Sequence, residues 1–228
     1  MPDNIYQKIF GYLTFYKDLY GSELIMDAEG FREQLQITGE KLEHPLWKYK
    51  KEIENCQKCA LGGSRIQFVF GVGNPAAQIM FVGEAPGAEE DKTGIPFVGR
   101  AGKLLDQLLE EIKFKRDDVF IANILKCRPP NNRDPLPDEV EKCIPYLHRQ
   151  IEMVQPSVIV ALGRIAAQNL LGITEPLRNM RGRTWLYQGV DMIVTYHPAA
   201  VLRNPNLMEN SREDFRTIAR ICAEKQIQ

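Results

Sequence analysis

The chain has 228 residues, of which 44% are hydrophobic and 26% are charged, and its formal net charge is -1. This length can bury a full core, and the composition is that of a folded globular protein rather than a disordered or fibrous one. Because the net charge is close to zero, any contact with nucleic acid has to come from local basic patches rather than from the whole chain.

The apolar segments are of strand length, too short to cross a membrane, and the N-terminus lacks the basic and apolar order of a signal peptide. We therefore expect a cytoplasmic protein without membrane association. Five cysteines in such a chain argue against a disulfide framework and favour metal ligation or free thiols.

The N-terminal part of the chain is expected to be helical. Apolar residues recur at helical spacing between residues 4 and 20, and a second helical stretch runs from about Leu42 to Ile53. We divide the chain into an N-terminal helical extension, residues 1–50, and a main domain, residues 51–228. The extension is expected to pack on the main domain or on a partner protein.

The main domain alternates apolar strands with amphipathic helices. Strands are expected at 79–82, 119–123, 157–162 and 192–196, with an edge strand at 68–70. Helices are expected at 101–113, 140–154 and 163–171, and a last one is capped by Ser211. Strand 157–162 is apolar throughout, as in a sheet covered on both faces. The sequence therefore predicts an α/β fold, a three-layer αβα sandwich around a mostly parallel central sheet.

Three polar side chains stand at the ends of expected strands: Glu84, Asn123 and His197. The carboxyl ends of parallel strands lie at one edge of a sheet, where α/β proteins bind their ligands. Each residue alone could be a helix cap, a turn former or a structural histidine. The three together favour a binding site.

Four cysteines form a second pattern. Cys56 and Cys59 make a C-x2-C pair, and Cys127 and Cys143 follow at a spacing of C-x15-C. Four thiols in a cytoplasmic chain indicate a tetrathiolate site, although spacing does not decide between an iron-sulfur cluster and zinc. Cys222 falls on the apolar stripe of the last helix, so we expect it in the core.

Several segments, in order, resemble motifs of the type 4 uracil-DNA glycosylases. They are Gly83–Gly87 with Glu90–Asp91, Gly94–Gly102, Asn123–Pro130, Leu162–Gly163 and His197–Arg203. The cysteine spacing also resembles that of this family, in which four thiolates hold a structural [4Fe-4S] cluster. The resemblance covers roughly residues 56 to 221. It implies an enzyme that flips uracil out of DNA and hydrolyses its N-glycosidic bond.

The resemblance also implies roles for individual residues in a uracil pocket. Asn123 pairs with the uracil edge, Phe97 stacks on the base, and His197 stabilises the charge that develops on uracil O2. Ala85 lies in the loop whose backbone amides face the base. In better-known uracil glycosylases an aspartate occupies the position of Ala85. Here either Glu84 or Glu90 assists the attacking water, or preorganised charge and water positioned by the backbone provide most of the effect. An alternative role for Glu90 is to exclude the methyl group of thymine sterically.

The expected substrate is uracil-containing DNA, single- or double-stranded. By resemblance, Val201 and Leu202 form an apolar wedge that fills the gap left by the flipped base, and Arg203 touches a phosphate. Further backbone contacts are expected from basic residues in nearby loops, which are Lys126, Arg128, Arg133, Arg181 and Arg183.

Two other functions fit parts of the pattern. One is a non-catalytic iron-sulfur DNA-binding module on the same scaffold, which works with a replication or repair partner through residues 1–50. The other is an electron carrier, which would leave the chemistry of the strand-end loops unused.

Overall fold

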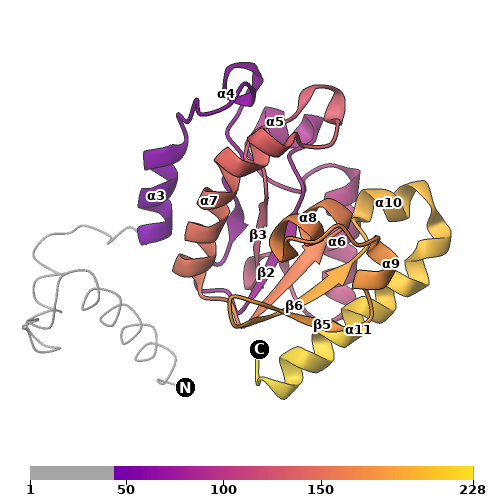
Figure 1. The fold of residues 1–228 in the computed structure, drawn as a ribbon. Coiled ribbons are helices and arrows are strands. Elements are labelled where there is room, and N and C mark those ends of the chain that lie inside the picture. The colour runs from indigo at the N-terminus through magenta and orange to yellow at the C-terminus, as the bar shows by residue number, and fades with distance from the viewer. Residues whose placement is uncertain (1–43, 228) are drawn as a thin grey trace, which may run out of the picture. The chain divides into compact units, whose positions relative to one another are not determined.

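A six-stranded sheet, in the order β1-β3-β2-β4-β6-β5, forms the centre of residues 44–227, the part of the chain that the structure describes (Figure 1). The structure is a computed structural model. The four central strands run parallel and are β2 (Ile79–Gly83), β3 (Phe120–Asn123), β4 (Val158–Leu162) and β6 (Val190–Thr195). Two antiparallel strands, β1 (Val72–Gly73) and β5 (Thr184–Tyr187), close the edges.

Helices cover both faces of the sheet, because successive side chains of a strand point to opposite sides. In β2, Met80 belongs to the core cluster that contains buried residues of α7 (Pro137–Val154). Its neighbour Phe81 belongs to a second cluster, with residues of α6 (Arg100–Glu111) and α11 (Met208–Glu224). Figure 1 shows α7 and α11 on opposite sides of the strands. The predicted three-layer αβα sandwich is thus confirmed.

The remaining elements of the described residues are short. The helices are α3 (Pro45–Ile53), α4 (Leu61–Ser64), α5 (Ala88–Thr93), α8 (Arg164–Leu171), α9 (Leu177–Met180) and α10 (Pro198–Arg203). Three 3-10 turns are η1 (Arg116–Asp118), η2 (Pro130–Asn132) and η3 (Pro205–Leu207). Within residues 44–227, no helix is long and apolar enough to span a membrane.

The helix α3 packs with the main domain. One compact unit begins at His44, and Leu46 and Ile53 are buried in the same core cluster as residues of α7. The boundary expected near residue 50 falls inside this helix, so we propose a boundary close to His44. The helix expected between residues 4 and 20 lies outside the described residues.

Two local expectations are wrong. Residues 68–70 form no strand, although Phe68 and Phe70 are buried in the core, and β1 is the edge strand instead. The last helix starts at Met208 rather than at a Ser211 cap, and the Ser211 hydroxyl donates to the Leu207 carbonyl. Phe68 and Phe70 are buried by core packing rather than by strand pairing, and the Ser211 hydroxyl bonds back to the preceding turn as that of a serine inside a helix does.

A buried polar network ties α11 to the sheet. The Arg181 guanidinium donates from Nε and Nη2 to the two carboxylate oxygens of Asp214, at 2.8 and 2.9 Å. The Thr195 hydroxyl donates to the same carboxylate at 2.6 Å. Asp214 is 6% and Thr195 0% exposed. Each hydrogen-bond partner of Asp214 therefore contributes to the stability of the fold, because a buried charge without its partners is costly.

Replacing Asp214 with Ala should lower the free energy of unfolding by about 3–5 kcal/mol, because it leaves the Arg181 cation without its carboxylate in a largely buried position. Urea unfolding followed by circular dichroism measures the change. Glu209→Ala is the matched control on the same helix, because Glu209 pairs with arginines at the surface. The control should change the free energy by less than about 1 kcal/mol. Equal effects would contradict the role of the network.

Candidate active site

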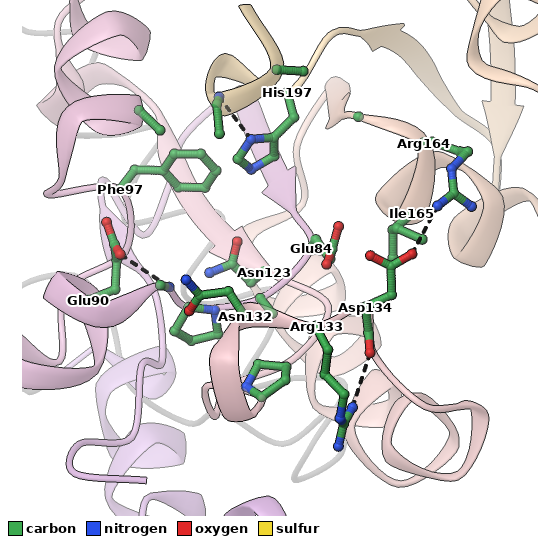
Figure 2. Close-up of a pocket in the computed structure, with 18 of the residues that line it drawn as sticks. Glu84, Glu90, Phe97, Asn123, Asn132, Arg133, Asp134, Arg164, Ile165 and His197 are labelled. Carbon is green, nitrogen blue, oxygen red and sulfur yellow. Dashed lines mark hydrogen bonds and ion pairs between the residues drawn. The ribbon is translucent and has the colours of Figure 1, made fainter. Parts of the chain in front are cut away.

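A pocket of about 490 Å³ opens at the carboxyl ends of the parallel strands (Figure 2). β2 lies between β3 and β4, so the connections that follow β2 and β3 lead to opposite sides of it. Such a reversal of strand order creates a crevice in which α/β proteins bind ligands. The pocket brings together Glu84, Asn123 and His197, the three strand-end residues identified in the sequence.

Asn123 ends β3 at the floor of the pocket, opposite Gly83 of β2. The asparagine is 2% exposed, and among the described residues its Oδ1 is buried without a hydrogen-bond partner. A Cβ on Gly83 would lie 2.3 Å from this Oδ1 and 2.6 Å from Cζ of Phe97, so only glycine leaves room here. The pocket therefore offers an acceptor that a bound ligand can satisfy.

His197 caps α10 and faces the pocket as a neutral donor. Its Nδ1 accepts the Ala199 amide hydrogen at 3.1 Å, so the proton of the neutral ring is on Nε2. Burial lowers the pKa of His197 to about 4, and the nearby Arg203 cation adds to this shift while Glu90 opposes it. The imidazole is thus uncharged at neutral pH and can donate from Nε2 to a ligand.

Phe97 forms an aromatic wall of the pocket. Its side chain is 5% exposed, and its ring centre lies 5.5 Å from that of His197 with 31° between the planes. Ala85 also lines the pocket, in the loop after β2. A flat ring beside backbone amides suits a planar, polar ligand.

The two candidate carboxylates have different surroundings. Burial raises the pKa of Glu84 to about 7; Asp134 adds to this shift, and Arg164 and Arg203 oppose it. A group that titrates near neutral pH can exchange a proton with a ligand or a water molecule.

Glu90 lines the same pocket, but its carboxylate is occupied by the backbone. Oε2 accepts the Gly87 amide hydrogen at 3.1 Å, and Oε1 accepts those of Val98 and Gly99, both at 2.9 Å. These bonds tie the loop after β2 to the segment that carries Phe97. Glu90 therefore organises the wall of the pocket.

Two charged pocket residues escaped the sequence analysis. Arg164 follows β4 and donates from Nη2 to Oδ2 of Asp134 at 3.0 Å, and both residues border the pocket near Glu84 (Figure 2). The strand-end rule that found Glu84 applies equally to Arg164, which comes two residues after Leu162. Asp134 gave no such signal, because only tertiary packing brings its loop to the pocket.

Six of the expected DNA-contacting residues fall into two groups. Arg203 lines the pocket and Leu202 is 37% exposed next to it. Arg133 also lines the pocket, with its guanidinium donating to both carboxylate oxygens of Glu139 at 2.8 and 2.6 Å. These three residues are accessible at the rim.

The side chains of the other group are buried or paired inside the fold. Val201 is 1% exposed in the core, and Lys126 is 0% exposed, with its Nζ donating to the Asn123 carbonyl and to Gln150. Arg181 belongs to the Asp214 network and also stacks over Tyr196. Val201 and Lys126 therefore do not reach the surface, and the guanidinium of Arg181, whose side chain is 14% exposed, is engaged by Asp214.

The cysteines Cys56, Cys59, Cys127 and Cys143 are free thiols that lie near one another. Burial raises the pKa of Cys127, with Arg65 opposing and Cys59 and Cys56 adding to the shift. Burial also raises the pKa of Cys143 to about 11, and Cys127 and Cys59 again contribute. Within residues 44–227, no three His, Cys, Asp or Glu side chains form a group suited to a single metal ion.

Several groups donate hydrogen bonds to these sulfurs. The Tyr146 hydroxyl donates to Cys56 Sγ at 3.1 Å, and Arg65 Nη1 donates to Cys127 Sγ at 3.5 Å. The backbone amide of Lys126 donates to Cys143 Sγ at 3.3 Å. These donors and the nearby Arg65 cation oppose the effect of burial by stabilising the thiolate, which is the form that binds iron. Four cysteine thiols are the donor set that holds iron-sulfur clusters, so the residues present fit such a cluster.

The uracil DNA glycosylase superfamily model matches residues 70–220. The chain is 49% identical over 184 residues to the type-4 uracil-DNA glycosylase of Archaeoglobus fulgidus, which covers 77% of this chain and 92% of the relative. It is 50% identical over 190 residues to that of Sulfurisphaera tokodaii, covering 78% and 84%. With that of Thermotoga maritima it shares 48% over 157 residues, covering 68% and 81%. On this similarity, and with the fold and pocket described above, the chain belongs to the uracil-DNA glycosylase superfamily and, within it, to the type 4 family.

Proposed function

We propose that the strand-end pocket is the active site in which this chain removes uracil from DNA. The chain is a uracil-DNA glycosylase, a hydrolase that cleaves the N-glycosidic bond of uracil and leaves an abasic site for repair. The buried and unpartnered Oδ1 of Asn123 supports this use of the pocket most directly, because it requires a hydrogen-bond donor from the ligand.

Asn123 reads the Watson–Crick edge of the flipped base. Its Oδ1 accepts from uracil N3–H, and its amide nitrogen donates to uracil O4. Cytosine has an acceptor and a donor in the reverse positions, so each mismatched pair would cost about 1–3 kcal/mol. The side-chain amide thereby selects uracil over the normal base.

His197 stabilises the leaving group. As the glycosidic bond breaks, negative charge develops on uracil O2, and the Nε2–H of the neutral imidazole donates to it. Backbone amides of residues 84–87 assist. Phe97 stacks on the base and holds its plane between these donors.

Glu84 activates the attacking water. Its pKa of about 7 leaves much of the side chain ionised at neutral pH, so the carboxylate can accept a proton from water. Glu90 has its oxygens engaged by three backbone amides, so we assign it to the structure of the loop. The asparagine, histidine and carboxylate thus carry separate tasks.

Leu202 and Arg203 make the closest DNA contacts. Leu202 is the exposed apolar residue beside the pocket and acts as the wedge, while Arg203 and Arg133 reach phosphates. We give Val201 and Arg181 structural roles because they are buried or paired inside the fold. A protein partner for residues 1–50 and a cytoplasmic location stay predictions from the sequence.

The four cysteines hold a structural [4Fe-4S] cluster. When bound, the cluster cross-links the Cys56–Cys59 segment to the loop and helix that carry Cys127 and Cys143. Arg65 and Tyr146 donate hydrogen bonds to the ligating sulfurs. The alternative of a non-catalytic iron-sulfur module is not favoured, because it leaves the pocket and its polar groups without a use.

Incubation with a uracil-containing oligonucleotide, followed by alkali, should break the strand at uracil.

Asn123→Ala should reduce the single-turnover rate of this excision about 100-fold, because two hydrogen bonds to the base are lost. Affinity for DNA should change less than about threefold, since phosphate contacts dominate it. Asn169→Ala, on α8 outside the pocket, is the control. Equal losses of rate and affinity would contradict the reading role, and intact strands with folded wild-type protein would overturn the function.

The excision rate should rise with pH through about 7, because Glu84 accepts a proton only when ionised and its raised pKa delays ionisation until neutral pH. Glu84→Gln should be slower and should lose this rise. Single-turnover rates between about pH 5.5 and 8.5 give the profile. Glu89→Gln alters an exposed carboxylate that pairs with Lys92, and it should keep the wild-type profile. A rise that persists in Glu84→Gln would exclude Glu84 as the base.

Protein purified without oxygen should be brown, with broad absorption near ~400 nm. Cys143→Ala should lose iron and sulfide, because it removes one of four ligands. Cys222→Ala removes an equally buried cysteine from the core of α11 and should keep the full iron content. Iron, sulfide and zinc analysis measures the outcome. A colourless wild-type preparation that carries zinc would contradict the cluster.

A further inference from the structure

Phe97 has a backbone conformation that its residue type rarely adopts. Its φ angle is +54°, in the left-handed region where a side chain crowds the backbone. The ring nevertheless has to reach into the pocket beside His197 (Figure 2). Some other interaction must hold this conformation, because an unconstrained phenylalanine would leave it.

Arg116 supplies such an interaction from outside the pocket. It stands in η1, ahead of β3, and its Nη1 donates to the Phe97 carbonyl at 3.0 Å. Its Nη2 donates to the carbonyl of Pro96. The guanidinium is itself held by Asp106 of α6, whose Oδ1 accepts from Nη1 at 3.0 Å. One planar cation therefore binds two successive carbonyls and a carboxylate.

These contacts fix the peptide groups on both sides of the Phe97 α-carbon. The carbonyl of Pro96 belongs to the preceding peptide plane, and the carbonyl of Phe97 belongs to the following one. The same following plane carries the Val98 amide, which donates to Glu90. Since φ and ψ are the rotations between these two planes, Arg116 and Glu90 together fix the direction in which the Phe97 side chain leaves the backbone.

The first turn of α6 closes the remaining space. A Cβ on Gly102 would lie 1.7 Å from the Phe97 carbonyl oxygen, so this carbonyl rests directly against the helix. The carbonyl can approach only because residue 102 is glycine. Arg116 then binds the carbonyl beside that contact.

We propose that Arg116 is a positioning residue for the aromatic ring that stacks on uracil. The inference rests on the proposed stacking role of Phe97 and adds the group that holds it. Arg116 is not among the pocket-lining residues, and it binds the carbonyls of Pro96 and Phe97, so we expect it to act on the base through the Phe97 ring. It should therefore affect the chemical step and leave DNA binding unchanged.

A double-mutant cycle in the full-length, iron-loaded protein tests the proposal. Arg116→Met should reduce the single-turnover excision rate about tenfold, because a misdirected ring no longer fixes the base. Its affinity for DNA that contains an abasic site should stay within about twofold of wild type. In a Phe97→Ala background the same change should cost less than about twofold, since the ring through which it acts is gone.

Arg212→Met is the matched control, because Arg212 also pairs with a carboxylate of α6, that of Glu111, but its guanidinium binds Glu111 and Glu209 rather than the Phe97 segment. It should leave the rate unchanged. If Arg116→Met does not fold, Arg116→Lys keeps the cation and loses the fork, and it should show the same dependence on Phe97. Equal losses in both backgrounds, or no loss with Phe97 present, would overturn the proposal. Full activity of Phe97→Ala would instead refute the stacking role itself.

Discussion

The parallel pairing of β2 with β3 determines the geometry of the pocket. This register sets Gly83 opposite Asn123 and puts the asparagine amide at the sheet edge, within the space that a glycine leaves open. A shift by one residue would turn every side chain of β3 to the other face and remove the amide from the pocket. Both strands are buried along their length, so hydrophobic packing on two faces enforces the register.

Burial and hydrogen bonding, rather than residue type, separate the roles of similar side chains. Glu84 and Glu90 lie six positions apart and border one pocket, yet Glu84 is desolvated and titrates near pH 7 while Glu90 accepts three amide hydrogens. Arg203 and Arg181 differ in the same way, since one reaches the rim and the other pairs with Asp214. The surroundings of a charge decide whether it is available for chemistry.

One segment of the chain connects Asn123, the residue proposed to bind the uracil edge, with Cys127, one of the proposed cluster ligands. Lys126 lies between Asn123 and Cys127 and donates to the Asn123 carbonyl and to Gln150 from a fully buried position. On the other side, the carboxylate of Asp91 in α5 accepts amide hydrogens from residues 66 and 67, which follow the first cysteine pair. Polar contacts that are buried at Lys126 and partly buried at Asp91 therefore connect the loops around the pocket with the cysteine segments.

The sequence by itself determined the fold class, the family and the strand-end residues Glu84, Asn123 and His197. Apolar periodicity and the polar residue that ends each strand are local patterns, so they can be identified from the sequence alone. Only the tertiary structure decided that Arg181 pairs with Asp214 and that Val201 is buried. It also decided that backbone amides bind the Glu90 carboxylate and that Arg116 binds the Phe97 carbonyl. These depend on contacts between residues far apart in the chain, such as Arg181 with Asp214, and no local pattern marked these residues as partners.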